Sequence, residues 1–327
     1  MTSRSTVAVI VRDGDPLPPG LDAIIDGADI RLVRTAADLA IDLLEADVLA
    51  VFDFNSTLVR DGWRRSGRVR WIHAGSAGVD AVLFPETAAG DVVITNSRGV
   101  FGNAIAEYVL GLVLLFAKDL PTTLALQQRR SWRHRESEMI AGSRLLIVGA
   151  GSIGRAIGRL ARGVGMEVEG IARSERPETD FGRVRPSSEL RGALATADVV
   201  VIAAPLTDET RGLFGPLEFA AMRRGARLIN VGRGAIVDQA ALLDALTAGR
   251  LGGAGLDVFD DEPLPPDHPF WGLANVVVSP HMSGDFVGWQ EALGALFVDN
   301  FRRWQRGQPL LNVVDKQCYL APVGRVP

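Results

Sequence analysis

Short apolar runs rich in Val, Ile and Leu alternate with amphipathic stretches along most of the chain. Runs of this length between helical patterns predict parallel strands linked by helices, and therefore an α/β protein. In the first third of the chain we expect a helix over 36–45 and strands at 6–11, 30–33, 48–52, 69–73 and 92–96. Farther along we expect helices between most of the strands, which lie at 144–149, 166–171, 198–204, 227–231, 252–258 and 275–279.

Two longer helical patterns lie outside these strands. One runs from 103 to 132, with Asn103 as a suitable N-cap. Pro121 lies inside it and should break or kink the helix, because proline lacks the amide proton and clashes with the preceding turn. The other covers 285–306 and is followed by an irregular tail at 308–327.

A length of 327 residues and the two groups of strands both predict two domains. The last helix is expected to return to the first group of strands. We therefore expect a discontinuous domain of residues 1–102 and 285–327, with residues 103–284 inserted as the second domain. Cofactor and substrate would then meet in a cleft between the domains, a common place for such a site.

A glycine-rich turn follows the apolar run Leu145–Val148 and precedes an amphipathic helix. In the order strand, GxGxxG turn and helix, the glycines allow a tight bend and a close approach to a pyrophosphate, which also lies at the helix N-terminus. The alternative is an ordinary glycine turn. We expect the following residues to contact a dinucleotide: Gly149, Gly151, Ser152, Ile153, Gly154 and Arg155.

The end of the next strand indicates which nicotinamide cofactor binds. An acid there would bind the ribose hydroxyls of NAD(H), but the strand ends at Ala172. Arg173 and Ser174 follow, with Arg176 close by, and these groups can hold a 2′-phosphate. We therefore predict NADP(H) in preference to NAD(H). Two alternatives remain: the arginines form a solvated loop, or Glu175 serves as a displaced ribose acid.

Composition narrows the classes of partner and compartment. The net charge of −4 argues against nucleic acid or an acidic membrane surface as a partner. The longest apolar run, Tyr108–Ala117, is too short to span a bilayer and predicts a buried helix. The N-terminus lacks a signal-peptide pattern, and Cys318 is the single cysteine, so we expect no intrachain disulfide and a cytoplasmic protein. We expect no metal, because Asp260, Asp261 and Glu262 have no His or Cys partners at ligand spacing.

Polar residues also follow three later strands, where Rossmann-type domains place their ligands. The three segments are Ile229–Asp238, Gly255–Leu264 and Val277–Gly284. With Ala74–Asp80, Asn96–Phe101, Asp198–Val201 and Pro205–Thr207, they make the chain similar to the D-isomer-specific 2-hydroxyacid dehydrogenases over nearly its whole length. An arginine, a glutamate and a histidine in these contexts, 29 and then 19 residues apart, carry much of the resemblance.

The resemblance implies the following site. Arg233 would bind the carboxylate and carbonyl oxygen of a 2-oxo acid, since a guanidinium fork matches that planar group. His281 would be the general acid that protonates the carbonyl oxygen, and the base in reverse. Glu262 would bind the other imidazole nitrogen and favour the protonated ring. The substrate carboxylate would also meet the backbone amides of Ser76, Ala77 and Gly78, while Asp257 would contact the nicotinamide carboxamide.

The family also implies a fold and an assembly. We expect two Rossmann-like domains, with a doubly wound parallel-sheet nucleotide domain inserted into a smaller flavodoxin-like substrate domain. Pro205 and Val231 would line the cofactor site. The family is usually dimeric through the nucleotide domain, and in some relatives a tryptophan of the Trp132 region reaches the partner's active site. We therefore expect a homodimer.

Trp71, before His73, and Ser76, after Gly75, resemble the glyoxylate and hydroxypyruvate reductase-like branch. The expected reaction is hydride transfer between NADP(H) and a small 2-oxo or D-2-hydroxy acid, such as glyoxylate, hydroxypyruvate or a related 2-ketoacid. The segment Met282–Phe286 departs from the usual family pattern and leaves the substrate pocket open. The alternative is a nucleotide-sensing, corepressor-like binding protein on the same fold.

Overall fold

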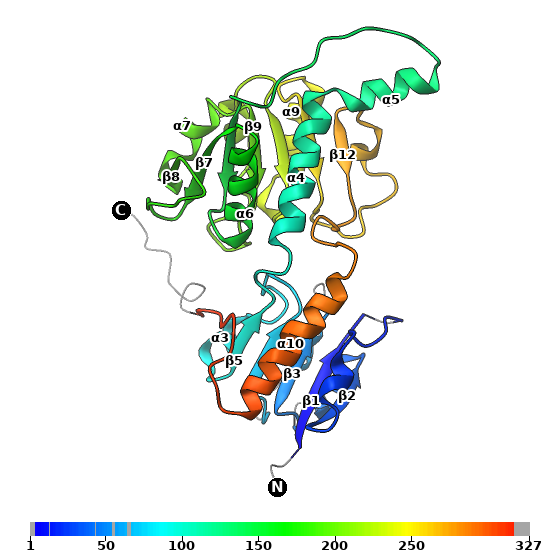
Figure 1. Ribbon diagram of the computed structural model, residues 1–327, viewed down its shortest axis with the longest axis vertical. Helices are drawn as coiled ribbons and strands as arrows, with labels where there is room; N and C mark the ends of the chain where they lie inside the picture. Colours follow the sequence, from blue (N-terminus) through cyan, green and yellow to red (C-terminus); the bar gives the residue numbers. More distant parts are fainter. Residues whose placement is uncertain (1–3, 13, 43, 54–55, 64–66, 317–327) are drawn as a thin grey trace. The chain divides into compact units, whose positions relative to one another are not determined.

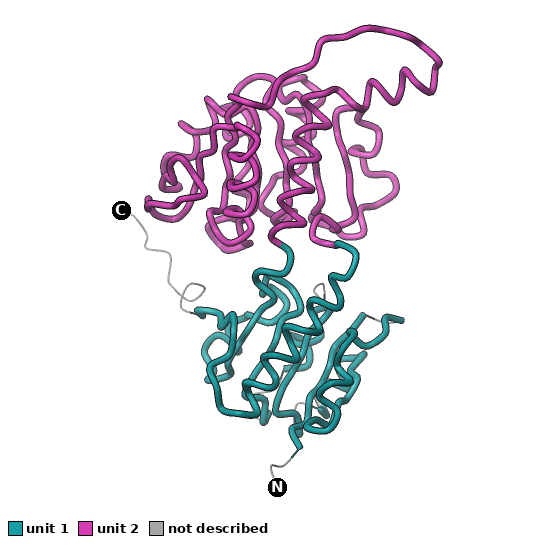
Figure 2. Tube along the Cα trace, viewed as in Figure 1, with its two compact units in different colours: residues 1–101, 286–327 teal, residues 102–285 magenta. Residues whose placement is uncertain are grey.

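The computed structural model describes residues 4–12, 14–42, 44–53, 56–63 and 67–316. Cys318 therefore lies outside the described residues. The chain divides into two compact units, one of residues 1–101 and 286–327 and the other of residues 102–285 (Figure 2). These divisions lie one residue from the predicted domain boundaries, and the roles assigned to the two domains remain predictions.

The smaller unit is built on five parallel strands. They are β1 Ser5–Ile10, β2 Ala28–Val33, β3 Val48–Val51, β4 Trp71–Ala74 and β5 Val93–Asn96. Their order in the sheet is β2-β1-β3-β4-β5, the doubly wound arrangement of flavodoxin-like folds. β3 and β4 are buried along their whole length, because both faces of the sheet are covered.

Helices cover both faces of this sheet. They are α1 Ala36–Asp42, α2 Leu58–Gly62, α3 Pro85–Ala89 and α10 Trp289–Gln305, with the 3-10 turn η1 Leu21–Ile24. α10 presents Phe297 and Phe301 to Trp71 at helical spacing, and the three side chains form one aromatic core. Gly294 lets α10 approach the chain closely, because a Cβ there would overlap the carbonyl of Pro19.

The larger unit is built on seven parallel strands. They are β6 Arg144–Val148, β7 Glu167–Ala172, β8 Arg183–Pro186, β9 Val199–Ile202, β10 Arg227–Asn230, β11 Gly253–Leu256 and β12 Val276–Val278. The order β12-β11-β10-β9-β6-β7-β8 reverses between β6 and β9, as in a dinucleotide-binding Rossmann sheet. The predicted fold class is therefore confirmed (Figure 1).

Every predicted strand corresponds to an observed one, with ends that differ by at most two residues. The prediction missed β8, which pairs only with β7 at the edge of the sheet. Its sequence alternates arginine with Val184 and Pro186, and only Val184 is buried. A single buried side chain is too weak a hydrophobic signal for a strand.

Helices complete the larger unit. They are α4 Gly102–Ala117, α5 Leu120–Gln128, α6 Ser152–Gly163, α7 Leu190–Leu194, α8 Pro216–Ala221 and α9 Gln239–Thr247, with the 3-10 turns η2 Ser187–Glu189, η3 Gly234–Ile236 and η4 Pro269–Gly272. Among the described residues, no single helix is long and apolar enough to cross a membrane. α4 and α5 meet such a criterion only as a pair, by length and composition, and they are bent by 63°.

Three helix predictions need correction. The pattern from 103 to 132 forms two helices, because Asp119 adopts a left-handed φ of 48° between them. Pro121 lies in the first turn of α5, where its missing amide proton costs nothing, and is not the break itself. α4 begins at Gly102, so Asn103 lies within its first turn and is not its N-cap.

The other predicted helix limits shift for local reasons. α1 ends at Asp42, three residues before the predicted end. α10 begins at Trp289, after Gly288 with a φ of 93°, and not at Asp285. In the tail, residues 308–316 form no helix or strand apart from an isolated bridge between Val313 and Thr95.

Candidate active site

The glycine turn after β6 is shaped by close backbone packing. Gly149 has a φ of 109°, and a Cβ there would lie 2.5 Å from the amide nitrogen of Ala204. A Cβ on Gly154 would overlap the carbonyl of Gly149. Gly151 is exposed, and a Cβ there would meet nothing within 4 Å. The outer glycines therefore pack the turn, while the middle one keeps the space before α6 open, as a bound pyrophosphate requires.

α6 starts directly from this turn and is suited to anion binding. It has no side-chain N-cap, so its first amides and its dipole are presented to whatever lies in front of them. Ser152 and Ile153 begin its first turn, and Arg155, two residues after Ile153, forms an ion pair with Glu178 at 3.5 Å. Pro205 and Val231 follow β9 and β10, so they belong to the same carboxyl edge of the sheet.

The segment after β7 forms a basic loop next to the turn. β7 ends at Ala172, as predicted, and Arg173 and Ser174 are exposed beyond it. Arg176 donates a hydrogen bond to the carbonyl of Ala150 at 2.7 Å, which ties this loop to the glycine turn. Glu175 pairs with Arg183 at 3.1 Å and is therefore already engaged elsewhere, which disfavours its use as a ribose acid.

Arg173 also acts on the loop after β9. A hydrogen bond from Thr207 is the largest cause that holds the pKa of Glu209 below its ordinary value, followed by a backbone hydrogen bond. The positive charge of Arg173 lowers the same pKa further. Arg173 thus lies near the loop that follows β9, next to the reversal of strand order in the sheet.

A histidine and a glutamate form the central acid–base pair. Nδ1 of His281 lies 2.8 Å from Oε2 of Glu262, and Oε1 of Glu262 accepts a hydrogen bond from the amide of Phe259 at 2.9 Å. Burial raises the pKa of Glu262, but the hydrogen bonds from His281 and Phe259 and the charges of His281 and Arg233 outweigh it, so its pKa is lowered. Glu262 is therefore a carboxylate near neutral pH.

The loop that carries His281 is held by Asp257, the residue after β11. Asp257 is 1% exposed, and its carboxylate accepts from Ser279 Oγ at 2.6 Å and from the amides of Met282 and Ser283, both at 2.9 Å. His281 has a φ of 54°, an uncommon value for a side chain of its size, and its amide donates to the carbonyl of Asp257 at 2.8 Å. Asp257 therefore braces the histidine loop, and its predicted nicotinamide contact stays a prediction.

Arg233 is positioned by a buried asparagine. Asn230, the last residue of β10, donates to the carbonyl of Arg233 at 3.0 Å and accepts from the amide of Gly232 at 3.0 Å. Gly234 packs so closely on the next loop that a Cβ would overlap the backbone of Phe259. The loops after β10 and β11 therefore touch, which explains why the charge of Arg233 acts on Glu262.

The loop that is predicted to bind the substrate carboxylate belongs to the smaller unit. Ser76, Ala77 and Gly78 follow β4 and are half-buried. The Ser76 hydroxyl donates to the carbonyl of Gly78 at 2.7 Å, and Nδ2 of Asn96 donates to the carbonyl of Ala77 at 2.7 Å. The structure thus shows an ordered loop at the carboxyl edge of this second parallel sheet.

Comparison with known proteins identifies the family. A family model for the NAD-binding domain of D-isomer-specific 2-hydroxyacid dehydrogenases matches residues 110–283. The chain belongs to the D-isomer-specific 2-hydroxyacid dehydrogenases. It is therefore an NAD(P)-dependent oxidoreductase, and the predicted family and enzyme class are confirmed.

Three relatives of the dehydrogenase illustrate the match. A glyoxylate reductase from Thermococcus gammatolerans is 31% identical over 76% of this chain and 77% of the relative. The structure of a D-isomer-specific 2-hydroxyacid dehydrogenase from Xanthobacter autotrophicus in complex with NADPH and MES is 30% identical, with a TM-score of 0.82 over 96% of this chain and 99% of that chain. The structure of an NADPH-dependent glyoxylate/hydroxypyruvate reductase from Sinorhizobium meliloti in complex with NADP and sulfate is 28% identical, with the same TM-score and coverage.

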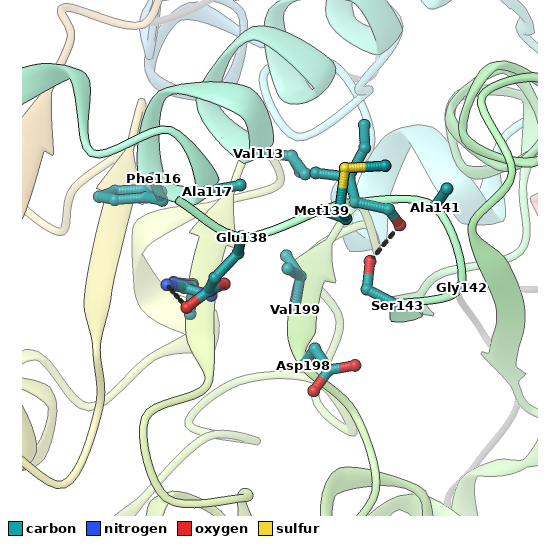
Figure 3. Close-up of a pocket in the computed structure, with 12 residues that line it drawn as sticks. Val113, Phe116, Ala117, Glu138, Met139, Ala141, Gly142, Ser143, Asp198 and Val199 are labelled. Carbon is teal, nitrogen blue, oxygen red and sulfur yellow. Dashed lines mark hydrogen bonds and ion pairs between the residues drawn. The ribbon is translucent and has the colours of Figure 1, made fainter. Parts of the chain in front are cut away.

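A hollow of about 290 Å³ lies elsewhere on the larger unit of the dehydrogenase (Figure 3). It is lined by the end of α4, by residues 138–143 and by Asp198 and Arg227, which stand at the amino ends of β9 and β10. The nucleotide turn and the histidine lie at the carboxyl edge, so this hollow is not part of the candidate site. Within the described ranges, no group of three or more His, Cys, Asp or Glu residues could hold a metal ion.

The sequence prediction did not include three supporting residues of the dehydrogenase. Asn230 is the last residue of β10, and Ser279 directly follows β12. Their position at strand ends was the signal in the sequence that could have identified them. Tyr108 of α4 shares a hydrogen bond with Ser279, while burial raises the pKa of its hydroxyl. That contact joins a helix to a loop far along the chain, and no local pattern predicts it.

Glu262→Gln tests the acid–base pair through its pH dependence. Because the pKa of Glu262 is lowered in the folded state, its charge stabilises the fold above the unfolded pKa of about 4.3, and this contribution disappears as pH falls through the folded pKa. We expect the variant to lose about 1 kcal/mol of unfolding free energy at pH 6, and much less at pH 3. Denaturant unfolding at each pH measures this, with the exposed Glu136→Gln as control. A loss that is equal at both pH values contradicts the lowered pKa.

Proposed function

We propose that this dehydrogenase reduces small 2-oxo acids, such as glyoxylate, hydroxypyruvate or a related 2-ketoacid, to D-2-hydroxy acids with NADPH in preference to NADH. The observation that carries the proposal is the 2.8 Å pair of His281 and Glu262 beside the Arg233 loop. An imidazole and a guanidinium at one sheet edge suit a substrate with a carbonyl next to a carboxylate.

The roles follow from the protonation of the pair. A nicotinamide, when bound, would supply the hydride that reduces the carbonyl group. Glu262 binds Nδ1 of His281, so the proton that His281 gives to the carbonyl oxygen is the one on Nε2. In the oxidation direction, Nε2 accepts the hydroxyl proton of the substrate. The carboxylate of Glu262 stabilises the protonated ring and fixes its orientation.

Arg233 binds the substrate carboxylate and polarises its carbonyl oxygen, through the paired donors of its guanidinium. The amides of the Ser76–Gly78 loop bind the same carboxylate. Relatives support the substrate class: the Thermococcus relative is named a glyoxylate reductase, and the Sinorhizobium protein a glyoxylate/hydroxypyruvate reductase.

The glycine turn and the basic loop hold the dinucleotide in this proposal. Gly151 and the first amides of α6 would hold the pyrophosphate, and Asp257 would contact the nicotinamide carboxamide. Arg173 and Ser174 bind the 2′-phosphate. Solved relatives in complex with NADPH or NADP support this preference.

We also propose that the enzyme is a homodimer that works in the cytoplasm. α5 buries none of its residues, and Leu124, Trp132 and Met139 are exposed. Figure 1 shows α5 and the loop after it extending away from the sheet of their own unit. Apolar side chains on such an arm gain free energy by packing on a second copy of the chain.

His281→Ala tests the catalytic role. Loss of a general acid is expected to lower kcat/KM for glyoxylate about 1000-fold, while the Kd for NADPH changes less than twofold. Steady-state NADPH oxidation and fluorescence titration measure the two, and the exposed His134→Ala serves as control. Lost NADPH binding would contradict the role. A wild type that binds NADPH but reduces none of glyoxylate, hydroxypyruvate, pyruvate and phenylpyruvate would favour the nucleotide-sensing alternative.

Arg173→Asp tests the cofactor preference. Replacing a cation by a carboxylate should lower the NADPH to NADH ratio of kcat/KM at least tenfold, since charge-assisted hydrogen bonds to the 2′-phosphate contribute about 1.5–3 kcal/mol. The exposed Arg224→Asp changes the net charge equally and should leave the ratio unaltered. An unchanged ratio in Arg173→Asp would show that Arg173 does not bind the phosphate.

Substitutions on the α5 arm test the dimer. Light scattering should give about twice the chain mass of 35.0 kDa for the wild type. Leu124→Glu combined with Trp132→Glu should shift the enzyme toward the monomer, because burying a charge in the interface is unfavourable. Leu217→Glu, at an exposed apolar position of α8, should leave the mass unchanged. A monomeric wild type rules the dimer out.

A further inference from the structure

The Ser76–Gly78 loop is tied back to the end of β5 by its carbonyl groups. The carbonyl of Ser76 accepts from the amide of Ser97 at 2.9 Å, and that of Ala77 accepts from Nδ2 of Asn96 at 2.7 Å. In a trans peptide the next amide points away from the carbonyl, so the amides of Ala77 and Gly78 face away from β5. Among the described residues, neither amide donates a hydrogen bond.

A chain of buried polar groups stands behind Ser97. Trp71 Nε1 donates to Thr95 Oγ1 at 2.8 Å, and Thr95 Oγ1 lies 2.9 Å from Nδ1 of His73. Nε2 of His73 lies 3.4 Å from Ser97 Oγ, which donates to the carbonyl of Ala74 at 3.1 Å. Trp71, His73, Thr95 and Ser97 are each 0% exposed, so no solvent competes for these hydrogen bonds.

The number of available protons decides which group donates in each of these buried hydrogen bonds. Ser97 has one hydroxyl proton and gives it to a carbonyl, so its bond with His73 needs a proton on Nε2. Burial lowers the pKa of His73 to about 3, so the ring is neutral near pH 7 and carries only that proton. Nδ1 is then an acceptor, and Thr95 donates its own proton to it while accepting from Trp71.

We propose that His73, as the Nε2-protonated tautomer of this chain, and Asn96 are positioning residues for the Ser76–Gly78 loop, and that they set its affinity for the substrate carboxylate. The inference rests on the proposed function and deepens it. His73 orients Ser97, the amide of Ser97 holds the carbonyl of Ser76, and Asn96 holds the carbonyl of Ala77. Each carbonyl shares a peptide group with the next amide, so these bonds aim the two amides at the carboxylate. None of these side chains needs to touch the substrate.

Thr95→Val and Asn96→Ala test the positioning role by kinetics. Thr95→Val keeps the side-chain shape but removes the proton donated to His73, and Asn96→Ala releases the carbonyl of Ala77. We expect KM for glyoxylate to rise about tenfold in each, with kcat and KM for NADPH within twofold of the wild type. Misaligned amides weaken carboxylate binding, whereas the hydride and proton transfers occur elsewhere on the substrate.

Thr87→Val is the matched control. Thr87 is equally buried in the same unit, but among the described residues its hydroxyl bonds the chain around α3, where it donates to the carbonyls of Val82 and Phe84 and accepts from the amide of Phe84. It should lower stability without changing KM for glyoxylate. An equal rise of KM in Thr87→Val, or no rise in Thr95→Val and Asn96→Ala, overturns the proposal.

Nitrogen NMR of histidine-labelled protein tests the tautomer independently of turnover. The chain has four histidines, so His134→Gln and His268→Gln simplify the assignment. We expect His73 to show a protonated Nε2 and an acceptor Nδ1 in the wild type, and the reverse pattern overturns the directed chain. A wild type that reduces no 2-oxo acid defeats the proposed function and the carboxylate role together. Kinetic failure confined to the variants defeats the positioning role alone.

Discussion

All seven strands of the larger sheet run parallel, and this constraint decides where its chemistry can lie. Parallel strands end at one edge, so the loops after β6, β7, β9, β10, β11 and β12 gather there. The glycine turn, Arg233, Glu262 and His281 all belong to these loops, although they are far apart along the chain. The hollow beside α4 lies at the opposite edge of the sheet (Figure 3).

Buried polar groups turn this shared edge into a defined geometry. Asp257 and Asn230 are each 1% exposed: Asp257 satisfies backbone amides of the loop after β12, and Asn230 satisfies backbone groups of its own loop after β10. Leaving such a group unpaired costs roughly 1–3 kcal/mol, so the loops cannot shift independently. His281 keeps its left-handed backbone because these bonds outweigh the local strain. In the smaller unit, polar side chains also stabilise a loop: Asn96 binds the Ser76–Gly78 loop directly, and His73 supports it through Ser97.

Much of the fold could be predicted from the sequence, because buried parallel strands are continuous apolar runs. Eleven strands and the glycine turn carried that signal, whereas the edge strand β8 buries a single valine. The helix break at Asp119 depends on a backbone angle, so the more conspicuous Pro121 misled the prediction. Of the candidate site, the residue types and their order were predictable, whereas the supporting Tyr108 was not, since its contact spans distant segments.

By itself, the sequence determined which residues could act in catalysis or binding and which strand each of them follows. It placed Ala172 and Arg173 at the end of β7 and a histidine after β12, because strand ends follow from local hydrophobic patterns. The family resemblance predicted the contact of Glu262 with His281, and only the tertiary structure decided that Arg183 pairs with Glu175 and that Arg176 binds the carbonyl of Ala150. Hydrogen bonds act over about 3 Å, and only packed loops from different strands bring such atoms that close.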